Sequence, residues 1–279
     1  MPEQSWTGRR AVITGAGSGI GRAFALRFAR MGADLVLCDI AEDRLEPVAV
    51  EARSLGVTVH TFAVDVRDAA AMRELAATVS DLGPVHLLIN NAGVATAGRV
   101  LDTPPEDWKW VVDVNLHGVV NGCQAFLPGM IAHGDKAHVI NLASASAYIG
   151  SPGIGAYSVT KHGVLGRSEV LDAELQATAV QIHVLCPGFV PTRILDDARI
   201  ASATPERDRK RAGRLFKNGR SPDQVVQAAL SAMRSGRLVV SVFPEAHALR
   251  VLRALPEVLA RPIRRAMARR AQRIAGVMS

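Results

Sequence analysis

The amino-acid sequence predicts an α/β fold: a doubly wound, mainly parallel, seven-stranded sheet with helices on both faces, followed by a basic helical extension at the C-terminus. Three observations lead to this prediction. Short runs rich in β-branched residues alternate with longer segments of helical periodicity from residue 10 to about 243. A glycine-rich stretch from Thr14 to Gly21 follows the first run. The final residues, 247–279, carry an excess of arginine.

Seven runs are predicted to be strands, at 11–14, 34–39, 59–65, 86–90, 138–144, 181–186 and 237–243. Helices are predicted between them, near 19–31, 68–80, 105–132, 155–178 and 221–235. Pro104–Pro105 and Ser221–Pro222 mark two helix starts, because proline is favoured in the first helical turn. Strands that are joined through helices run parallel, so these elements form one parallel sheet.

The composition indicates a globular chain with one large core. Its 279 residues are 48% hydrophobic, but length alone does not separate one domain from two. Because the alternation extends from residue 10 to about 243, we expect one domain at 1–246 and an extension at 247–279. Cys38, Cys123 and Cys186 are widely spaced, which predicts buried free thiols and no metal site. The N-terminus lacks the apolar stretch of a signal peptide, and no run reaches the roughly 18 apolar residues of a spanning helix, so we expect a cytoplasmic protein.

The net charge of +7 lies in the tail. Residues 247–279 hold eight arginines, no lysine and one glutamate, which leaves 25 basic and 25 acidic residues in the rest of the chain. Apolar residues recur there at spacings of three or four, which indicates an amphipathic segment interrupted by Pro256 and Pro262. Packing on the body or on a partner subunit is the favoured interpretation, ahead of an anionic membrane surface or a disordered arm. The tail has no aromatic residue and no nucleic-acid-binding module, so nucleic acid is not an expected partner.

One stretch interrupts the alternation. Residues 193–220 are highly charged and lie between a predicted strand end and a helix. A mobile segment that covers a substrate is expected at such a place, and a merely solvated insertion is the equal alternative.

The glycine-rich stretch, TGAGSGIG, predicts a site for a dinucleotide of the Rossmann type. Glycines there allow a tight turn, close approach of a pyrophosphate to backbone N–H groups, and packing of the helix on the strand. Asp39 follows Gly21 by 18 positions and ends the second strand. A carboxylate there accepts hydrogen bonds from ribose hydroxyls and repels a 2′-phosphate. The two positions where a basic side chain could bind such a phosphate hold Ser18 and Ile40. NAD is therefore favoured over NADP, with a simple turn cap as the alternative role of Asp39.

Tyr157 and Lys161 are predicted to lie one helical turn apart on one face. A free tyrosine, with a pKa of about 10, is a poor base at neutral pH, and a neighbouring ammonium lowers that pKa. Ser144 ends a buried strand at its carboxyl end, where parallel sheets bind ligands. Taken alone, the tyrosine and lysine would be an ordinary surface pair.

Together these motifs resemble the short-chain dehydrogenase/reductase family over about residues 8–243. TGAGSGIG is similar to its T-G-x-x-x-G-x-G loop, and Asn90-Asn91-Ala92-Gly93 to its N-N-A-G. Ser144, Tyr157 and Lys161 fit its S…Y-x-x-x-K, and Pro187-Gly188 with Thr192 its P-G-x-x-x-T. Departures are small: Ala143 and Ala147 stand where a serine and a glycine are frequent.

The resemblance implies a role for each matching residue. Tyr157 would be the general acid/base, Lys161 would lower its pKa and bind the nicotinamide ribose, Ser144 would orient the substrate oxygen, and Asn115 would hold a water in a proton relay. The implied cofactor-binding residues are Gly15, Ser18, Gly19, Ile20, Gly21, Asp39, Asp65, Val66, Asn91, Ala92, Gly93, Tyr157, Lys161, Pro187, Gly188, Val190 and Thr192. The other tyrosine, Tyr148, has no lysine four residues on and is expected to be structural.

The expected function is NAD-dependent interconversion of a hydrophobic secondary alcohol and its ketone, with a homodimer or homotetramer as the assembly. The residues that the resemblance places around the reacting carbon are nearly all apolar: Val94, Ala95, Ala145, Ile154, Phe189, Ile194 and Leu195. A 3-oxoacyl-type reductase of the same family is one alternative, disfavoured by Asp39. A cofactor-bound regulatory or scaffold protein is the other, since fold does not fix function.

Overall fold

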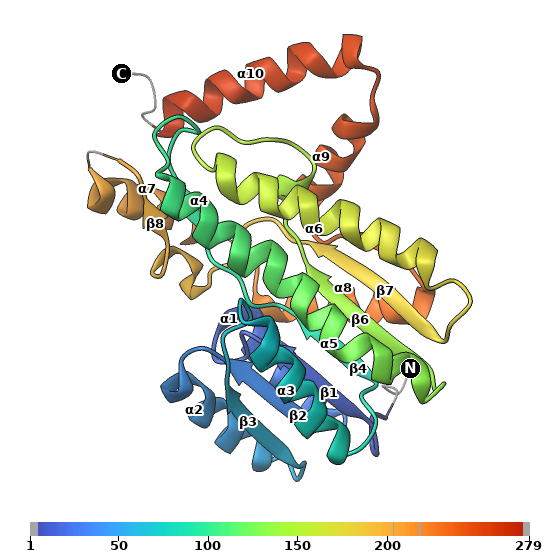
Figure 1. The fold of residues 1–279 in the computed structure, drawn as a ribbon. Coiled ribbons are helices and arrows are strands. Elements are labelled where there is room, and N and C mark those ends of the chain that lie inside the picture. Colours follow the sequence, from blue (N-terminus) through green and yellow to red (C-terminus); the bar gives the residue numbers. More distant parts are fainter. Residues whose placement is uncertain (1–4, 203, 218, 276–279) are drawn as a thin grey trace.

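The computed structural model describes residues 5–202, 204–217 and 219–275. Its main sheet is seven-stranded and wholly parallel, in the order β3-β2-β1-β4-β6-β7-β9, which confirms the predicted fold (Figure 1). The strands are β1 (Arg10–Thr14), β2 (Asp34–Asp39), β3 (Val59–Ala63), β4 (Leu87–Asn90), β6 (Ala137–Leu142), β7 (Val180–Cys186) and β9 (Val239–Ser241). Each of them overlaps a predicted strand.

Helices cover both faces of the sheet because the strands bury side chains in both directions. On β1, Ile13 packs into one hydrophobic cluster and its neighbour Val12 into the other. The first cluster takes in α1 (Gly19–Arg30), α2 (Glu42–Arg53) and α8 (Pro222–Ser235). The second takes in α3 (Ala69–Asp81), α5 (Gly118–Ala132) and α6 (Gly155–Glu174).

Helix α2 was not predicted from the sequence. Its segment EDRLEPVAVEAR is rich in charge and contains Pro47, which weakens the helical pattern. In the structure Leu45, Val48, Ala49 and Ala52 are buried against the sheet. Tertiary packing therefore decides this element, and it brings a further arginine to the cofactor side, as described below.

The predicted helix 105–132 is divided. It consists of α4 (Pro105–Val112), a π-helical turn (Asp113–His117) and α5, with Gly118 N–H donating to the carbonyl of Asp113. Asn115 lies within the π turn and is fully buried. Such turns within longer helices are frequent at functional sites.

The charged segment 193–220 carries its own secondary structure. It contains the short helix η3 (Arg193–Leu195), strand β8 (Arg199–Ile200) and α7 (Pro205–Lys217), and β8 pairs with β5 (Thr96–Ala97). The Arg209 guanidinium donates to the carbonyls of Asp196 and Ala198, each at 2.9 Å. These contacts tie the start of the segment to α7, while most of the described residues of α7 are exposed.

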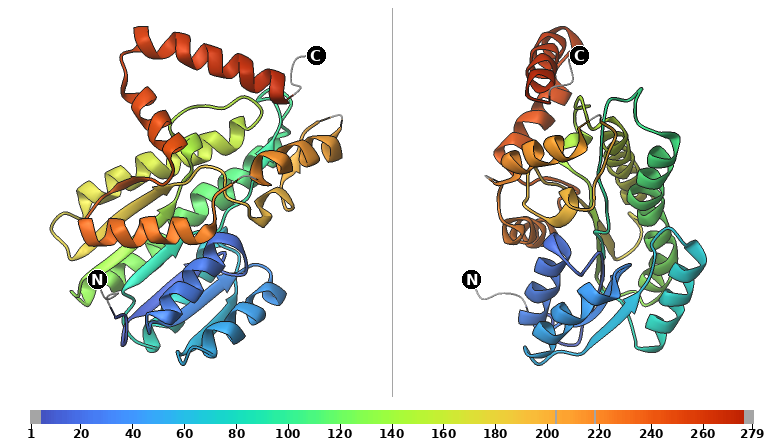
Figure 2. Two further views of the ribbon diagram at one scale, coloured as in Figure 1. Left: turned by 180° about the vertical axis from the view of Figure 1, so that it is seen from behind. Right: turned by 90° about the vertical axis from the view of Figure 1, so that its left-hand side faces the viewer.

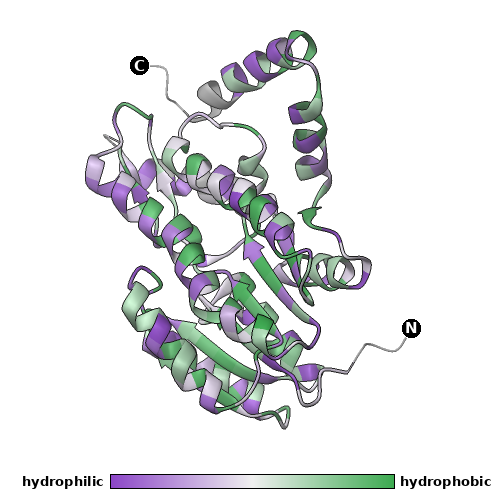
Figure 3. Cartoon of the chain, turned by 45° about the vertical axis from the view of Figure 1, so that its right-hand side comes forward, coloured by the Kyte–Doolittle hydropathy of each residue, from purple (hydrophilic) through white to green (hydrophobic). Residues whose placement is uncertain are grey.

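The tail forms two helices, α9 (Pro244–Ala254) and α10 (Glu257–Ala275). The break falls at Pro256 as predicted, but Pro262 lies inside α10, and the expected domain boundary after residue 246 falls inside α9. Helix α9 packs on the domain, where Leu252 is buried, whereas α10 extends beyond the end of the sheet (Figure 2). Residues 257–275 are helical, which does not fit the disordered-arm interpretation, and hydrophobic and hydrophilic residues alternate along α10 (Figure 3). None of the helices in the described part of the chain is long and apolar enough to cross a membrane.

Candidate active site

The candidate site lies where the strand order reverses. Strand β1 pairs with β2 on one side and with β4 on the other, and their chain connections lead away in opposite directions. In open parallel sheets, the carboxyl ends of the strands at such a point leave a crevice for a ligand. The loops that follow β1, β4, β6 and β7 all emerge at this edge.

The loop after β1 has the backbone that the glycine motif predicts. Gly15 and Gly19 have φ of +63° and +53°, in the left-handed region. A Cβ on Gly21 would lie 2.1 Å from the Gly15 carbonyl oxygen, so only glycine allows α1 to start so close to β1. Ser18 caps α1 without a side-chain hydrogen bond, and the first turn has no acidic residue. Backbone N–H groups at this end are thus suited to the pyrophosphate of a dinucleotide.

The loop after β4 is tied to the glycine loop. The side-chain amide of Asn91 donates to the carbonyls of Thr14 (3.0 Å) and Gly15 (2.9 Å). The backbone N–H groups of Asn91 and Ala92 donate to the Thr14 hydroxyl, at 3.0 and 3.1 Å. Thr14 therefore positions both loops, and sequence reasoning had placed it only at the edge of the motif.

Asp39 stands at the end of β2 beside the glycine loop. Its two carboxylate oxygens accept hydrogen bonds from the backbone N–H groups of Gly17 (3.0 Å) and Ala41 (3.1 Å). The turn-capping role is therefore present. A carboxylate can accept about four hydrogen bonds, so capacity remains for ribose hydroxyls.

Arg44 is the residue near Asp39 that sequence reasoning missed. A Cβ on Gly17 would lie 2.6 Å from the Arg44 Cβ and 3.0 Å from an Asp39 carboxylate oxygen. From the sequence, only positions 18 and 40 are expected to offer a basic residue here, because α2 is not among the predicted helices. Arg44 forms an ion pair with Asp197, at 3.0 Å.

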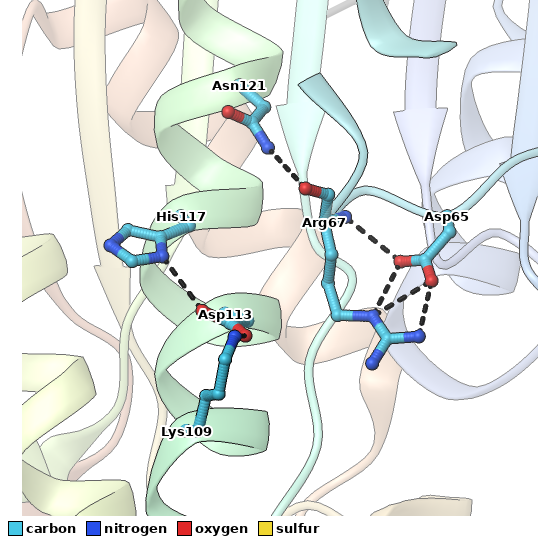
Figure 4. Close-up of polar contacts among 6 residues, drawn as sticks. All are labelled: Asp65, Arg67, Lys109, Asp113, His117 and Asn121. Carbon is cyan, nitrogen blue, oxygen red and sulfur yellow. Dashed lines mark hydrogen bonds and ion pairs between the residues drawn. The ribbon is translucent and has the colours of Figure 1, made fainter. Parts of the chain in front are cut away.

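Asp65 is engaged with its neighbour Arg67 (Figure 4). The Arg67 Nε lies 2.8 Å from one carboxylate oxygen, and this hydrogen bond lowers the pKa of Asp65 below its usual value. Val66 is buried, and Asn121 on α5 donates to its carbonyl at 2.8 Å. Of these two implied cofactor-binding residues, Asp65 is thus held by Arg67 and Val66 by α5.

The tyrosine, serine and lysine meet at the carboxyl end of β6. Strand β6 ends at Leu142 and not at 144 as predicted, and Ser144 follows in the loop. Its side chain forms a hydrogen bond with the Tyr157 phenol. The Lys161 Nζ donates to the Leu142 carbonyl at 2.8 Å and lies 5.6 Å from the centre of the Tyr157 ring.

Asn115 joins this group through its side chain. Its amide oxygen accepts the Val94 N–H at 2.8 Å, and its amide nitrogen donates to the Val94 carbonyl at 2.9 Å and the Thr160 hydroxyl at 3.2 Å. A Cβ on Gly93 would lie 3.3 Å from Asn115 Oδ1 and 3.6 Å from Lys161 Nζ. The structure thus brings all four predicted residues to one place beside Gly93.

Burial controls the electrostatics of this group. It raises the pKa of Tyr157, and the Ser144 hydrogen bond opposes that rise in part. Burial also lowers the pKa of Lys161 to about 8. Burial, the largest influence on Tyr157, thus acts against the lowered pKa that the sequence predicts for it, and the role of Lys161 in lowering that pKa stays a prediction.

The segment after β7 crosses from that group to the glycine loop. The Pro187 carbonyl accepts the Ala145 N–H at 2.8 Å, and Val190 is buried. Further along, the Thr192 methyl lies 2.8 Å from where a Gly19 Cβ would be. A second unpredicted neighbour is Glu245 of α9, because a Cβ on Gly188 would lie 2.3 Å from its carboxylate.

The residues expected at the substrate end differ in exposure. Ala145 is buried, Phe189 is 48% exposed, and Val94, Ala95, Ile154, Ile194 and Leu195 are partly buried. Ile154 forms a parallel bridge with Gly98, and the Ala95 carbonyl accepts the Arg199 N–H at 3.1 Å. The loop after β4 and the segment 193–200 are therefore in contact.

Two further predictions are confirmed. Tyr148 is buried and its hydroxyl lies 2.9 Å from the Ser241 hydroxyl, which is a structural role. Cys38, Cys123 and Cys186 are buried free thiols. Within the described residues, no cluster of His, Cys, Asp and Glu could hold a metal ion.

A phenol that is hydrogen-bonded to a serine and lies beside a buried lysine can exchange a proton with an alcohol or ketone oxygen. Next to it, the glycine cradle and the end of β2 fit a dinucleotide. The geometry thus provides both parts of a redox site: a proton donor or acceptor, and a place for a hydride carrier.

Comparison with known proteins leads in the same direction. The family model for short chain dehydrogenases matches residues 9–202. The putative oxidoreductase SadH of Mycobacterium tuberculosis is 36% identical over 254 residues, which are 89% of this chain and 91% of SadH. A short chain dehydrogenase/reductase from Burkholderia phymatum, crystallised in complex with NAD, aligns with a TM-score of 0.84 and 33% identity over 92% of this chain and 96% of its own.

A probable oxidoreductase of M. tuberculosis, EphD, is 38% identical over 259 residues, 88% of this chain but only 43% of EphD. The chain thus spans less than half the length of that relative. The 1-deoxy-11-beta-hydroxypentalenate dehydrogenase of Streptomyces exfoliatus is 40% identical over 187 residues, 66% of this chain and 68% of the relative. With the family model matched from β1 to β8 and the motif residues gathered at one edge of the sheet, this chain belongs to the short-chain dehydrogenase family.

Proposed function

We propose that the protein is an NAD-dependent oxidoreductase that interconverts a hydrophobic secondary alcohol and its ketone, with Tyr157 as the general acid/base. The observation that carries this proposal is the meeting of Tyr157, Ser144, Lys161 and Asn115 beside the glycine cradle. The Streptomyces relative is named as a dehydrogenase of a hydroxylated compound, which supports a hydroxyl substrate.

In this proposal each residue has one task. Ser144 donates a hydrogen bond to the substrate oxygen, and Tyr157 takes up the hydroxyl proton during oxidation or returns it during reduction. Lys161 stabilises the phenolate, since its ammonium lies 5.6 Å from the centre of the Tyr157 ring. Asn115 positions Val94 and the loop after β4. NAD, when bound along Gly15, Gly19 and Asp39, would supply the hydride acceptor or donor.

The apolar character of the segment around the reacting carbon supports a hydrophobic substrate. Val94, Ala145, Ile154, Phe189 and Leu195 offer few polar groups that could bind a charged or polyhydroxylated compound. We test this with a panel of alcohols and ketones of graded size and polarity, assayed with NAD and NADP in parallel. Turnover of bulky apolar secondary alcohols with NAD is expected. Activity confined to small charged or polyhydroxylated substrates would contradict the substrate class, and 3-oxoacyl thioesters with NADPH as the best pair would favour the 3-oxoacyl reductase.

We also infer that the chain forms a homodimer or homotetramer and that α10 is a subunit contact. Apolar side chains on α10 stay in water: Val258 is 79%, Leu259 55%, Ile263 46% and Met267 41% exposed. A second subunit would bury this stripe and so gain hydrophobic free energy.

The mass in solution, from light scattering after gel filtration, tests the contact. The double substitution Leu259→Asp and Ile263→Asp should lower the mass, whereas Leu101→Asp, at a site that is 95% exposed elsewhere, should not. An anionic membrane is the competing partner. A chain that is monomeric and that co-sediments with phosphatidylglycerol vesicles through the same two residues would replace the subunit contact by a membrane contact.

A further inference from the structure

The segment from Thr192 to Ala198 runs along the cofactor side of the glycine loop. At one end, the Thr192 methyl lies 2.8 Å from where a Gly19 Cβ would be. At the other end, the Asp197 carboxylate receives both terminal nitrogens of Arg44, at 3.0 and 3.3 Å. The segment, referred to below as the strap (192–198), thus touches the glycine loop at its nicotinamide end and α2 at its ribose end. Figure 2 shows this region at the same end of the sheet as the start of α1.

The strap has a fixed position because contacts on its other side hold it. Arg209 on α7 donates to three carbonyls of the strap, those of Leu195, Asp196 and Ala198. Immediately beyond, β8 pairs with β5. Arg199 contacts Asp107 at 3.0 Å and stacks on the Trp110 ring at 4.1 Å. Asp197 is therefore a fixed carboxylate that holds the flexible side chain of Arg44.

Arg44 is well placed to recognise a different cofactor. Its Cβ approaches Gly17, and Gly17 N–H binds the Asp39 carboxylate where ribose hydroxyls are expected. A guanidinium in that position is a suitable partner for the 2′-phosphate of NADP, since it binds phosphate with two parallel hydrogen bonds. In the structure, however, the same two hydrogen bonds go to Asp197.

We propose that Asp197 is a specificity-determining residue for the cofactor: it draws Arg44 onto the strap and so keeps this guanidinium away from the 2′-phosphate. The inference rests on the proposed NAD-dependent function and extends it. NAD preference then has two sources, namely the Asp39 carboxylate, which repels the phosphate, and the Arg44–Asp197 pair. Both partners are partly exposed, at 30% and 42% of their side-chain surface, so the pair is weak and the effect of breaking it is modest.

The test measures dissociation constants of NAD and NADP by calorimetry on the full chain, without substrate. Asp197→Asn should tighten NADP binding by about fivefold, in line with the weak coupling of exposed ion pairs, and leave NAD binding within about twofold. The double variant Arg44→Gln with Asp197→Asn should lose that gain. Glu46→Gln is the matched control, because it breaks the Arg53–Glu46 pair of 2.9 Å on the same helix, and neither cofactor should respond.

An unchanged NADP affinity in Asp197→Asn overturns the proposal, and so does a gain that persists in the double variant, because Arg44 would then have no part in it. A wild-type chain that binds neither NAD nor NADP is a different result, since it removes the proposed dehydrogenase function itself. Thermal unfolding of each variant confirms that a lost gain does not come from a damaged fold.

Discussion

The two ends of the same parallel sheet use buried titratable groups in opposite ways. At the carboxyl end, Tyr157 and Ser144 are only partly buried and lie beside the buried Lys161. Toward the amino end, His138 and His183 are 4% and 0% exposed and contact each other, with 3.0 Å between Nδ1 of His138 and Nε2 of His183. The first group can reach a ligand, whereas the second is closed within the protein.

The hydrogen bonds of the histidine pair determine its protonation. The His183 Nδ1 lies 2.7 Å from the Arg237 carbonyl, which can only accept, so this nitrogen carries the proton. Nε2 of His183 then accepts from Nδ1 of His138, and both rings are neutral. Burial lowers the pKa of both, that of His138 to about 3. Toward the amino end, burial therefore keeps both histidines neutral in the folded protein near pH 7. At the carboxyl end, burial shifts the pKa of groups that a substrate can reach.

The largest expected effect separates the two tyrosines. Tyr157→Phe removes the proton donor and should lower kcat by about 10²–10⁴-fold, the usual contribution of a general acid/base. Its affinity for NAD should change little. The only other tyrosine provides the control, and Tyr148→Phe should retain activity within about threefold. Among the described residues, the Tyr148 hydroxyl contacts the Ser241 hydroxyl and the Cys186 thiol, and neither belongs to the proposed catalytic group. Full activity of Tyr157→Phe on the best substrate would disprove the mechanism.

A second expected effect is acid sensitivity at the amino end. The folded-state pKa of His138 is lowered, so the unfolded chain takes up a proton first as pH falls below 6.5, and stability is lost from there toward pH 3. Between pH 6.5 and 5 this residue alone should cost about 2 kcal/mol of unfolding free energy. Urea unfolding at a series of pH values measures the slope.

His138→Gln should lower stability at pH 7, where a buried hydrogen bond is lost, yet flatten the slope between pH 6.5 and 5. His247→Gln, at an exposed position on α9, should leave the slope unchanged. A His138→Gln chain with the wild-type slope would show that the histidine pair is not the source of the acid sensitivity.

The carboxyl end should show the opposite pH response, in activity instead of stability. Oxidation of an alcohol requires the phenolate, and burial raises the pKa of Tyr157, so kcat/KM for oxidation should rise by up to about tenfold per pH unit above neutrality. Reduction requires the phenol and should stay level over the same range, because the phenol remains protonated until the pH approaches the raised pKa of Tyr157. In Lys161→Met the rising part of the kcat/KM profile for oxidation should move to higher pH, because the phenolate loses its neighbouring ammonium. An unchanged pH profile in this variant would show that Lys161 acts only by binding the nicotinamide ribose.

The smallest expected effect concerns the contribution of the buried Tyr148 to stability. Tyr148→Phe should lower the free energy of unfolding by about 1 kcal/mol, because the buried Ser241 hydroxyl loses its partner. Tyr157→Phe should be neutral or slightly stabilising, since it removes a polar group that burial penalises. Denaturant unfolding measures both free energies of unfolding. Equal losses in Tyr148→Phe and Tyr157→Phe would contradict the prediction that only the Tyr148 hydroxyl stabilises the fold.

The predictable part of the fold consists of elements whose hydrophobic pattern is unambiguous. All seven strands were found from short runs of apolar and β-branched residues, and most of these strands are buried on both faces, as β2 is from Leu35 to Cys38. Helix α2 was missed because its apolar residues are few and Pro47 interrupts them. The π turn at Asn115 was missed because an extra residue in a helical turn leaves no mark on a short periodic pattern. Strands β5 and β8 were also missed, because two residues each are too few to form a recognisable pattern.

The chemistry of the site was determined by the sequence itself: the glycine turn, Asp39 at a strand end, and Tyr157 with Lys161 one turn on. These depend on local backbone geometry and spacing, which neighbouring residues set. What only the tertiary structure decided depends on residues far apart in the chain. The pairing of Arg44 with Asp197, the contact of Glu245 with Gly188, and the burial that raises the pKa of Tyr157 all arise when the fold places separate segments together, because desolvation and charge depend on distance in space and not along the chain.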